Sequence, residues 1–276
     1  MLKYVPAPQL LCHRIVWSFL FLSLIVIFSG NRKQFFPSIL APRIVSLYLL
    51  AALLVGMNWL IYVWAVNNGF IIESSLGYFI NPLISVILGV TFLRERLRPL
   101  QWVPIGLATA GVLYLTISVG SFPWIALTLA LSFAAYGLVK KIAPLSSLFG
   151  LTLETGLLFA PALAYLWLCQ SRGQASFFHS GITGDVLMIG AGLATTIPLL
   201  FFTSAAQRFS LSHLGILQYI SPTLQFLMGV IVFKEPFSHA RFIGFGFVWL
   251  ALIIFVAEGY FASKTKTALD APSPEI

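Results

Sequence analysis

The feature that most constrains this chain is a series of apolar stretches, each about twenty residues long, joined by short connections. A helix of about 20 apolar residues is the length that crosses the hydrocarbon of a bilayer. Nine stretches are predicted as spans: 10–29, 44–66, 73–92, 100–119, 122–139, 148–169, 186–205, 211–233 and 241–261. The pattern predicts an all-α integral membrane protein.

The composition agrees with a lipid environment. Charged residues make up 9% of the chain and hydrophobic residues 59%. In soluble domains roughly a quarter of the residues are charged. The net charge of +8 lies mainly in the short connections, and no basic stripe alternates with stacking aromatic residues. The lipid bilayer is therefore an expected partner, and nucleic acid is not.

The basic residues predict the orientation of the chain. With nine alternating spans, one face collects Arg32, Lys33, Arg43, Arg94, Arg96, Arg98, Lys140, Lys141, Arg208, Lys264 and Lys266. The other face collects Lys3, Arg172, Lys234 and Arg241. Because Lys and Arg accumulate on the cytoplasmic side, the first face is predicted to be inside. This predicts a multi-pass protein of a bacterial inner membrane with a cytoplasmic carboxyl terminus.

The chain matches itself at a constant offset of 140 residues. The matching positions include an Ile-x-Pro pair, a Gly-Val pair, and Glu95 with Glu235. The two glutamates follow spans of opposite direction and are interpreted as structural residues at helix ends. The sequence is therefore predicted to be a tandem duplication with inverted halves, which many transporters use to surround a midplane site.

The two predicted repeats differ in their number of spans. The first, 1–119, holds four spans, the second, 120–262, holds five, and 263–276 is predicted to be a disordered cytoplasmic tail. The segment 122–139 has no counterpart after residue 1, so the fold is expected to be a five-plus-five repeat that lacks its first helix. A late start codon or a truncation would explain this, and a functional nine-helix protein is the alternative.

Two prolines at matching positions point to a central site. Asn81-Pro82 lies within the third span, and Ser221-Pro222 lies within the eighth. Helices broken by proline at equivalent places in inverted halves indicate a binding site, although membrane helices also tolerate proline for packing. The predicted substrate-facing residues are Asn58, Trp59, Tyr78, Asn81, Gln218, Tyr219 and Gln225, with Pro82 and Pro222 as helix breaks.

Several polar residues leave two interpretations open. Asn58 either lines a cavity or makes an interhelical hydrogen bond. Glu154 is a candidate for proton coupling or a structural hydrogen-bond partner, since an ionisable group at bilayer depth is costly. Arg14 corresponds to Glu154 across the repeat, and its side chain either takes part in function or extends to the membrane surface. Cys12 and Cys169 are interpreted as free thiols, with a disulfide as the alternative.

Enzyme chemistry finds no support in the sequence. The chain has no G-x-S-x-G elbow, no P-loop and no H-E-x-x-H motif, and its four histidines lack metal-ligand spacing. We therefore expect no catalytic residue, no metal and no cofactor. Without a nucleotide site, transport would depend on an ion or substrate gradient.

Several strings resemble a known family. They are HRIVWS (13–18), MNWLIYVWAVN (57–67), ESSLGYFINPL (73–83), ERLRPLQW (95–102), LSFAAYGLVKK (131–141) and LQYISPTLQFL (217–227). They are similar to the RarD group of the drug/metabolite transporter superfamily, in which two inverted EamA-like repeats of five helices each form the fold. The resemblance covers 4–261 and implies a permease. The missing first helix departs from the pattern, and so do Arg94 and Lys234, which stand where the family commonly has Gly.

Together these features predict a secondary transporter of small metabolites or drug-like molecules, with a small-molecule substrate in a cavity between the second, third, seventh and eighth spans. A membrane sensor or scaffold without flux is the alternative, and a homodimer is left open. A hydrated midplane cavity would favour the transporter, and a dry core the scaffold.

Overall fold

The computed structural model describes residues 5–29, 41–119, 122–231 and 239–269. Regular structure in these ranges is helical, and eight helices are long and apolar enough to cross a membrane. Seven are α1 (Ala7–Phe28), α3 (Pro42–Asn67), α4 (Ile71–Thr91), α6 (Trp124–Ile142), α7 (Ser147–Ser171), α8 (Gly181–Arg208) and α11 (His239–Leu269). The eighth is α5 (Trp102–Val119), which follows the short helix η1 (Pro99–Gln101). The described part of the chain is thus a multi-pass helical bundle.

The segment 211–233, predicted as the eighth span with a helix break at Pro222, is broken as expected. That segment holds two short helices, α9 (Leu211–Leu217) and α10 (Ile220–Ile231), separated by a turn at Gln218 and Tyr219. Pro222 has no N–H to donate to the Gln218 carbonyl, which instead accepts from the Ser221 N–H at 3.1 Å. The proline therefore explains the break. The five-plus-five repeat itself stays a prediction.

The expected helix break at Pro82, by contrast, is wrong, because α4 runs unbroken from Ile71 to Thr91 with Pro82 inside it. Membrane helices tolerate an internal proline where neighbouring helices pack closely against it. Such packing exists here: a Cβ added to Gly215 of α9 would lie 2.8 Å from the Pro82 carbonyl oxygen. Of the two matching prolines, only Pro222 accompanies a break.

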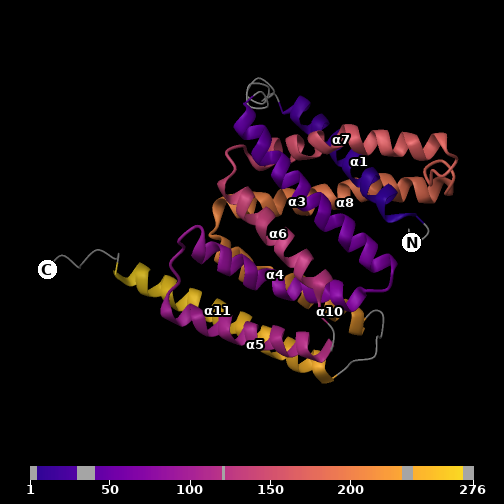
Figure 1. The fold of residues 1–276 in the computed structure, drawn as a ribbon. Helices are drawn as coiled ribbons and strands as arrows, with labels where there is room; N and C mark the ends of the chain where they lie inside the picture. Colours follow the sequence, from indigo (N-terminus) through magenta and orange to yellow (C-terminus); the bar gives the residue numbers. More distant parts are fainter. Residues whose placement is uncertain (1–4, 30–40, 120–121, 232–238, 270–276) are drawn as a thin grey trace.

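The helices pack in pairs that are distant in sequence. Figure 1 shows α5 and α11 side by side at one edge of the bundle, and α1 near α7 and α8 at the other. Between these edges α6 packs against α3 and α4, and α4 also packs against α9. The pairs α1 with α7, α4 with α9 and α5 with α11 join segments that match at the offset of 140 residues.

Small residues allow the closest helix contacts. A Cβ added to Gly192 of α8 would lie 2.5 Å from the Trp17 Cβ of α1. This glycine therefore lets the two helices approach, as small residues do in membrane bundles. Large apolar side chains such as Leu53, Phe201 and Ile253 are more than half exposed on the outside of the bundle. Such a surface suits contact with lipid.

Candidate functional site

Two groups of polar side chains lie inside the bundle. The first, which we call the central polar site, lies near the middle of several helices and consists of Arg14, Trp59, Tyr62, Tyr78, Asn81, Thr195 and Gln218. The second, the Lys140–Glu154 network, joins the end of α6 to the first half of α7. They differ in how completely their polar atoms are paired.

Arg14 of α1 points into the bundle. Its Nε donates a 2.8 Å hydrogen bond to the Thr195 hydroxyl, which lies at the middle of α8. Its guanidinium lies over the Trp59 ring, 4.9 Å from the ring centroid. Tyr62 and Tyr78 also lie near the guanidinium, and their rings are 5.9 Å apart. The side chain therefore reaches the core of the bundle, contrary to the interpretation in which it extends to the membrane surface.

The site continues along one face of α4. Tyr78 and Asn81 are three residues apart and so share a helix face. The Asn81 amide donates to the Gln218 side-chain oxygen, at the turn between α9 and α10. Asn81 Oδ1 and Gln218 Nε2 are buried without a hydrogen-bond partner among the described residues. Because orphaned buried polar atoms are unfavourable, this pair fits a place where a polar ligand or water completes the bonding.

The structure brings together only some of the predicted site residues. Trp59, Tyr78, Asn81 and Gln218 belong to the central polar site. Asn58 instead makes interhelical hydrogen bonds, at 2.8 Å to the Leu129 carbonyl and 2.9 Å to the Ser132 hydroxyl of α6.

The two remaining predicted residues lie elsewhere. Tyr219 is 1% exposed and packs in an apolar cluster with Leu76, Phe79 and Phe245. Its hydroxyl has no partner among the described residues. The side chain of Gln225 lies outside the described residues. Tyr219 therefore contributes to packing in this structure, and the predicted role of Gln225 stays a prediction.

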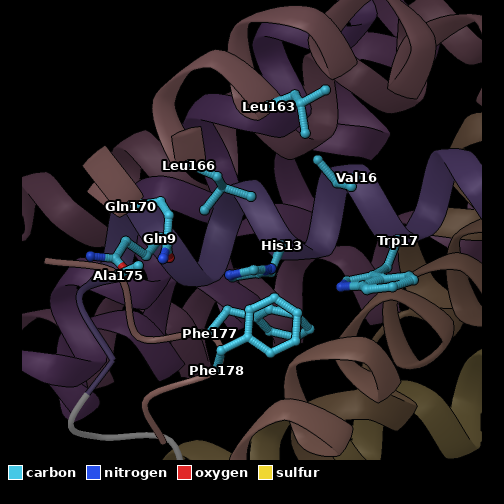
Figure 2. Close-up of a pocket in the computed structure, with 10 residues that line it drawn as sticks. All are labelled: Gln9, His13, Val16, Trp17, Leu163, Leu166, Gln170, Ala175, Phe177 and Phe178. Carbon is cyan, nitrogen blue, oxygen red and sulfur yellow. The ribbon is translucent and has the colours of Figure 1, made fainter. Parts of the chain in front are cut away.

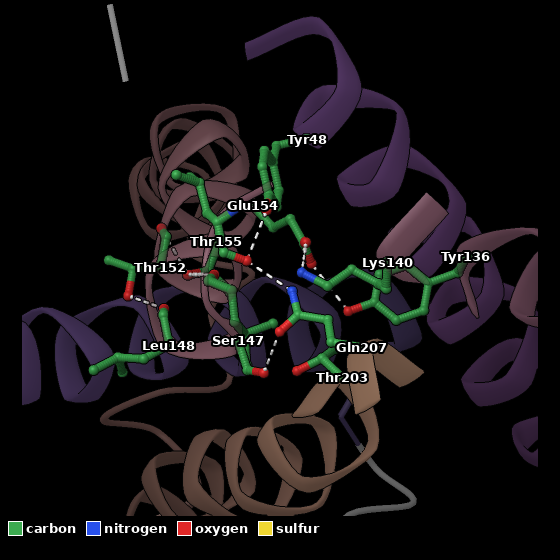
Figure 3. A network of polar contacts seen from close by, with 12 residues as sticks. Tyr48, Tyr136, Lys140, Ser147, Leu148, Thr152, Glu154, Thr155, Thr203 and Gln207 are labelled. Atoms are coloured by element: carbon green, nitrogen blue, oxygen red, sulfur yellow. Dashed lines mark hydrogen bonds and ion pairs between the residues drawn. The ribbon is translucent and has the colours of Figure 1, made fainter. Parts of the chain in front are cut away.

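Figure 3 shows the Lys140–Glu154 network, in which Tyr48, Tyr136, Lys140 and Glu154 are fully buried. Lys140 Nζ lies 2.5 Å from Glu154 Oε1, and the Tyr136 hydroxyl donates to Glu154 Oε2 at 3.0 Å. The ammonium also lies 4.9 Å from the ring centroid of Tyr48. The exposed fractions of the lysine and glutamate side chains are 0% and 1%. Both carboxylate oxygens are therefore paired, and the cation has a partner.

The polar groups around the Lys140–Glu154 pair are also hydrogen-bonded. The Tyr48 hydroxyl bonds both the N–H and the carbonyl of Leu145. Gln207 donates to the same carbonyl at 2.7 Å and accepts from Ser147 at 3.1 Å. A Cβ added to Gly150 would lie 2.8 Å from Lys140 Nζ, so only glycine leaves room for the buried ammonium. The network thus ties α3, α6, α7 and α8 together.

Sequence reasoning missed this pairing because it assigned Lys140 to a cytoplasmic connection. The lysine instead lies in the last turn of α6, which extends to Ile142. Tyr136 and Lys140 are four residues apart on one helix face, which is the sequence signal that could have placed both beside one carboxylate. The role of Glu154 in proton coupling stays a prediction.

Other glutamates lie at helix ends. Glu95 accepts from the N–H groups of Leu211 and Ser212, at 2.6 and 2.8 Å, and so caps the start of α9. This agrees with the predicted structural role, although the capped helix is not the one that precedes Glu95. Glu235 and Lys234 lie outside the described residues. Glu258 of α11 pairs with Arg98 at 2.8 Å. Cys12 and Cys169 are free.

A separate recess of about 360 Å³ lies between α1, the end of α7 and residues 175–178 (Figure 2). Its walls include His13, Trp17, Phe177 and Phe178. Gln9 bonds the backbone of Gln174 and Ser176, so its amide is already engaged. None of the predicted site residues lines this recess.

The chain is similar to known membrane transporters. Residues 1–117 match the EamA-like transporter family. The chain is 42% identical to Protein RarD of Streptomyces exfoliatus, over 100% of this chain and 88% of the relative. It is 44% identical to the uncharacterized transporter YojE of Bacillus subtilis, over 92% of this chain and 86% of the relative. The chain belongs to the EamA-like transporter family and is a membrane transporter.

The relatives named RarD define the group within that family. Protein RarD of Escherichia coli is 40% identical over 96% of this chain and 89% of its own length. The chain is thus a RarD-like member of the family. A crystal structure of another protein aligns with a TM-score of 0.66, over 91% of this chain and 88% of that one. At 19% identity this last likeness concerns the fold alone.

Proposed function

We propose that this chain is a secondary transporter that carries small molecules across a bacterial inner membrane through the central polar site. The observation that carries the proposal is the Asn81–Gln218 pair. It lies at mid-helix in α4 and at the break between α9 and α10, and each amide keeps an unpaired polar atom. A ligand that completes these bonds would bind where the two halves of the chain meet.

The two sides of the pair differ in backbone structure, and this difference supports a transport cycle. On one side α4 is continuous, and on the other the chain turns at Gln218 and Tyr219. Discontinuous helices place backbone carbonyls and helix ends beside substrates in many transporters. In this proposal α10 changes its angle to α9 at the turn, while α4 keeps the site in place.

The energy source is an ion or substrate gradient in this proposal. Glu154 stays the candidate for proton coupling, and its contacts set a strict condition. Protonating Glu154 would leave the Lys140 ammonium buried without a counter-charge, which is costly. A coupling role therefore requires that Lys140 lose its proton or move in the same step.

The direct test is an uptake comparison in cells with and without the gene. The panel contains labelled small metabolites and chloramphenicol, because a Pseudomonas aeruginosa relative, 29% identical, bears the name chloramphenicol-sensitive protein RarD. We expect the internal level of at least one compound to depend on the gene and to return with a plasmid copy. Unchanged levels across the panel, with the protein present in the membrane, would favour a sensor or scaffold.

The orientation of the chain is tested separately with single cysteines at Ser38 and Asn68 in a background without Cys12 and Cys169. Asn68 follows α3 and is exposed, and Ser38 lies outside the described residues. Because the connection at 32–43 is rich in Lys and Arg, we expect a membrane-impermeant thiol reagent to label only Asn68→Cys in intact cells. Labelling of Ser38→Cys alone would reverse the topology.

A further inference from the structure

We propose that the central polar site binds its substrate through a carboxylate group, and that Arg14 is the residue that binds it. This inference rests on the proposed transport function, because it names the chemical class of ligand for the same site. The observation behind it is the guanidinium of Arg14, which lies inside the bundle and has no acidic partner among the described residues.

The charge of Arg14 is not balanced within the described part of the chain. The ion pairs found there are Arg98–Glu258 and Lys140–Glu154, and neither includes Arg14. Thr195, which bonds its Nε, is a neutral side chain at the middle of α8. A cation at this depth is unfavourable without a counter-charge, and such residues commonly mark substrate pathways. An anionic ligand would supply the missing charge.

The guanidinium of Arg14 also has donor nitrogens available for a carboxylate. Its Nε is engaged by Thr195, whereas the described residues offer its two terminal nitrogens no hydrogen-bond partner. Arg14 is a partly exposed residue, unlike the fully buried Lys140. The guanidinium lies over the Trp59 ring, which favours a cation–π contact. A planar fork of donors held in this way matches the two oxygens of a carboxylate.

The number of charges favours a carboxylate over a phosphate. Lys140, the other cation buried in the described part of the bundle, is already paired with Glu154. The other polar groups of the site are the neutral phenols of Tyr62 and Tyr78 and the amides of Asn81 and Gln218. One positive charge balances a carboxylate, whereas a phosphate group carries nearly two negative charges at neutral pH.

Glu73 is the internal alternative to a ligand. It lies in the first turn of α4, and its Oε2 is buried without a partner among the described residues. If Arg14 paired with Glu73 in another state of the protein, no ligand carboxylate would be needed. Glu73→Gln separates the two explanations: with an internal pair, a carboxylate would bind only after this substitution, whereas a ligand site in the unaltered chain responds with and without it.

The experiment measures the unfolding midpoint of the purified full chain in detergent, with ligands added at matched ionic strength. The probes are acetate, butyrate and benzoate, each against its neutral amide, together with inorganic phosphate. A ligand that binds only the folded state raises the midpoint. We expect at least one carboxylate to raise it while the matching amide does not. Glu73→Gln and the exposed-site control Arg43→Gln should keep this response.

Variants of Arg14 complete the test. Arg14→Gln should abolish the carboxylate response, and Arg14→Lys should weaken the apparent affinity roughly tenfold, because lysine keeps the charge but loses the planar fork. Equal responses to acids and amides, a response to phosphate alone, no response to any carboxylate, or a carboxylate response that appears only in Glu73→Gln would each overturn the proposal. Carboxylate binding without gene-dependent uptake would instead refute transport and leave this inference standing.

Discussion

The two buried polar groups of this protein contrast in a way that separates structure from function. In the Lys140–Glu154 network both carboxylate oxygens are bonded, and the ammonium contacts a carboxylate and the face of Tyr48. In the central polar site Arg14 lacks a counter-charge, and Asn81 and Gln218 each keep an unpaired atom among the described residues. Both groups join several helices, but only one has bonds left to make.

A network whose polar atoms are all paired has no free donor or acceptor for a ligand. A network with unpaired atoms can bind one. Buried polar groups cost free energy unless they are paired. The bundle meets this cost internally at Lys140 and Glu154, which therefore hold α6 against α7. In the central polar site the buried groups stay unpaired among the described residues, and a substrate or water bound there would lower their free energy.

The largest expected effect follows from breaking the saturated pair. Glu154→Gln leaves Lys140 charged and unpaired in a fully buried place, and Lys140→Met leaves the carboxylate in the same condition. We expect each single variant to lose about 3–5 kcal/mol of stability. The free energy of unfolding is measured by denaturant titration in detergent micelles.

The double variant, Lys140→Met with Glu154→Gln, is the matched control for these singles. It removes both charges and keeps an acceptor for the Tyr136 hydroxyl, so most of the lost stability should return. If the double variant is stable but gene-dependent uptake loses its dependence on a proton gradient, Glu154 is a coupling residue, and a purely structural role is wrong.

Substitutions in the central polar site are expected to reduce transport more than they reduce stability. Asn81→Ala and Gln218→Ala each remove half of the amide pair. We expect uptake of any gene-dependent compound to fall roughly tenfold per molecule of transporter, as for loss of a hydrogen bond to the ligand. Uptake is divided by the amount of protein in the membrane. Full activity in both variants, or losses that only follow protein level, would show that the pair is not part of the site.

The smallest effect is expected at Glu95, which caps α9 away from both groups. Glu95→Gln keeps one acceptor oxygen for the two N–H groups and removes the negative charge at the helix start. We expect a loss of about 1 kcal/mol in stability, with uptake per molecule unchanged. Arg96→Gln, an exposed neighbour in the same connection, should change neither quantity. A loss of uptake in Glu95→Gln at constant stability would extend the site to this connection.

The sequence predicted the class of fold well, because helix length and hydropathy are local properties. It predicted Asn81 and Gln218 from their prolines, and the structure places these two side chains together. It failed on the backbone at Pro82, since the close approach of Gly215 to α4 is a tertiary contact. Equal motifs in the two halves therefore did not give equal helices.

The charges were harder to assign from sequence. Lys140 follows an apolar stretch and has a second lysine beside it, so it looked like part of a connection. Its burial depends on Gly150 and Glu154 of another helix. Arg14 looked like a residue near a span end, and its direction depends on Thr195, far away in the chain. Partners at such separations leave no periodic signal in a single sequence.

The measurement that tests the central claim most directly is the access of water-soluble reagents to the two groups. Single cysteines replace Gln218 in the central polar site, Thr155 beside the Lys140–Glu154 network, and Leu53 on the exposed apolar face of α3, in a chain without Cys12 and Cys169. Each variant is treated with a small charged methanethiosulfonate in native membranes. The account predicts rapid modification at Gln218→Cys and little at Thr155→Cys or Leu53→Cys. An unreactive Gln218→Cys, or a Thr155→Cys that reacts as fast, would contradict it.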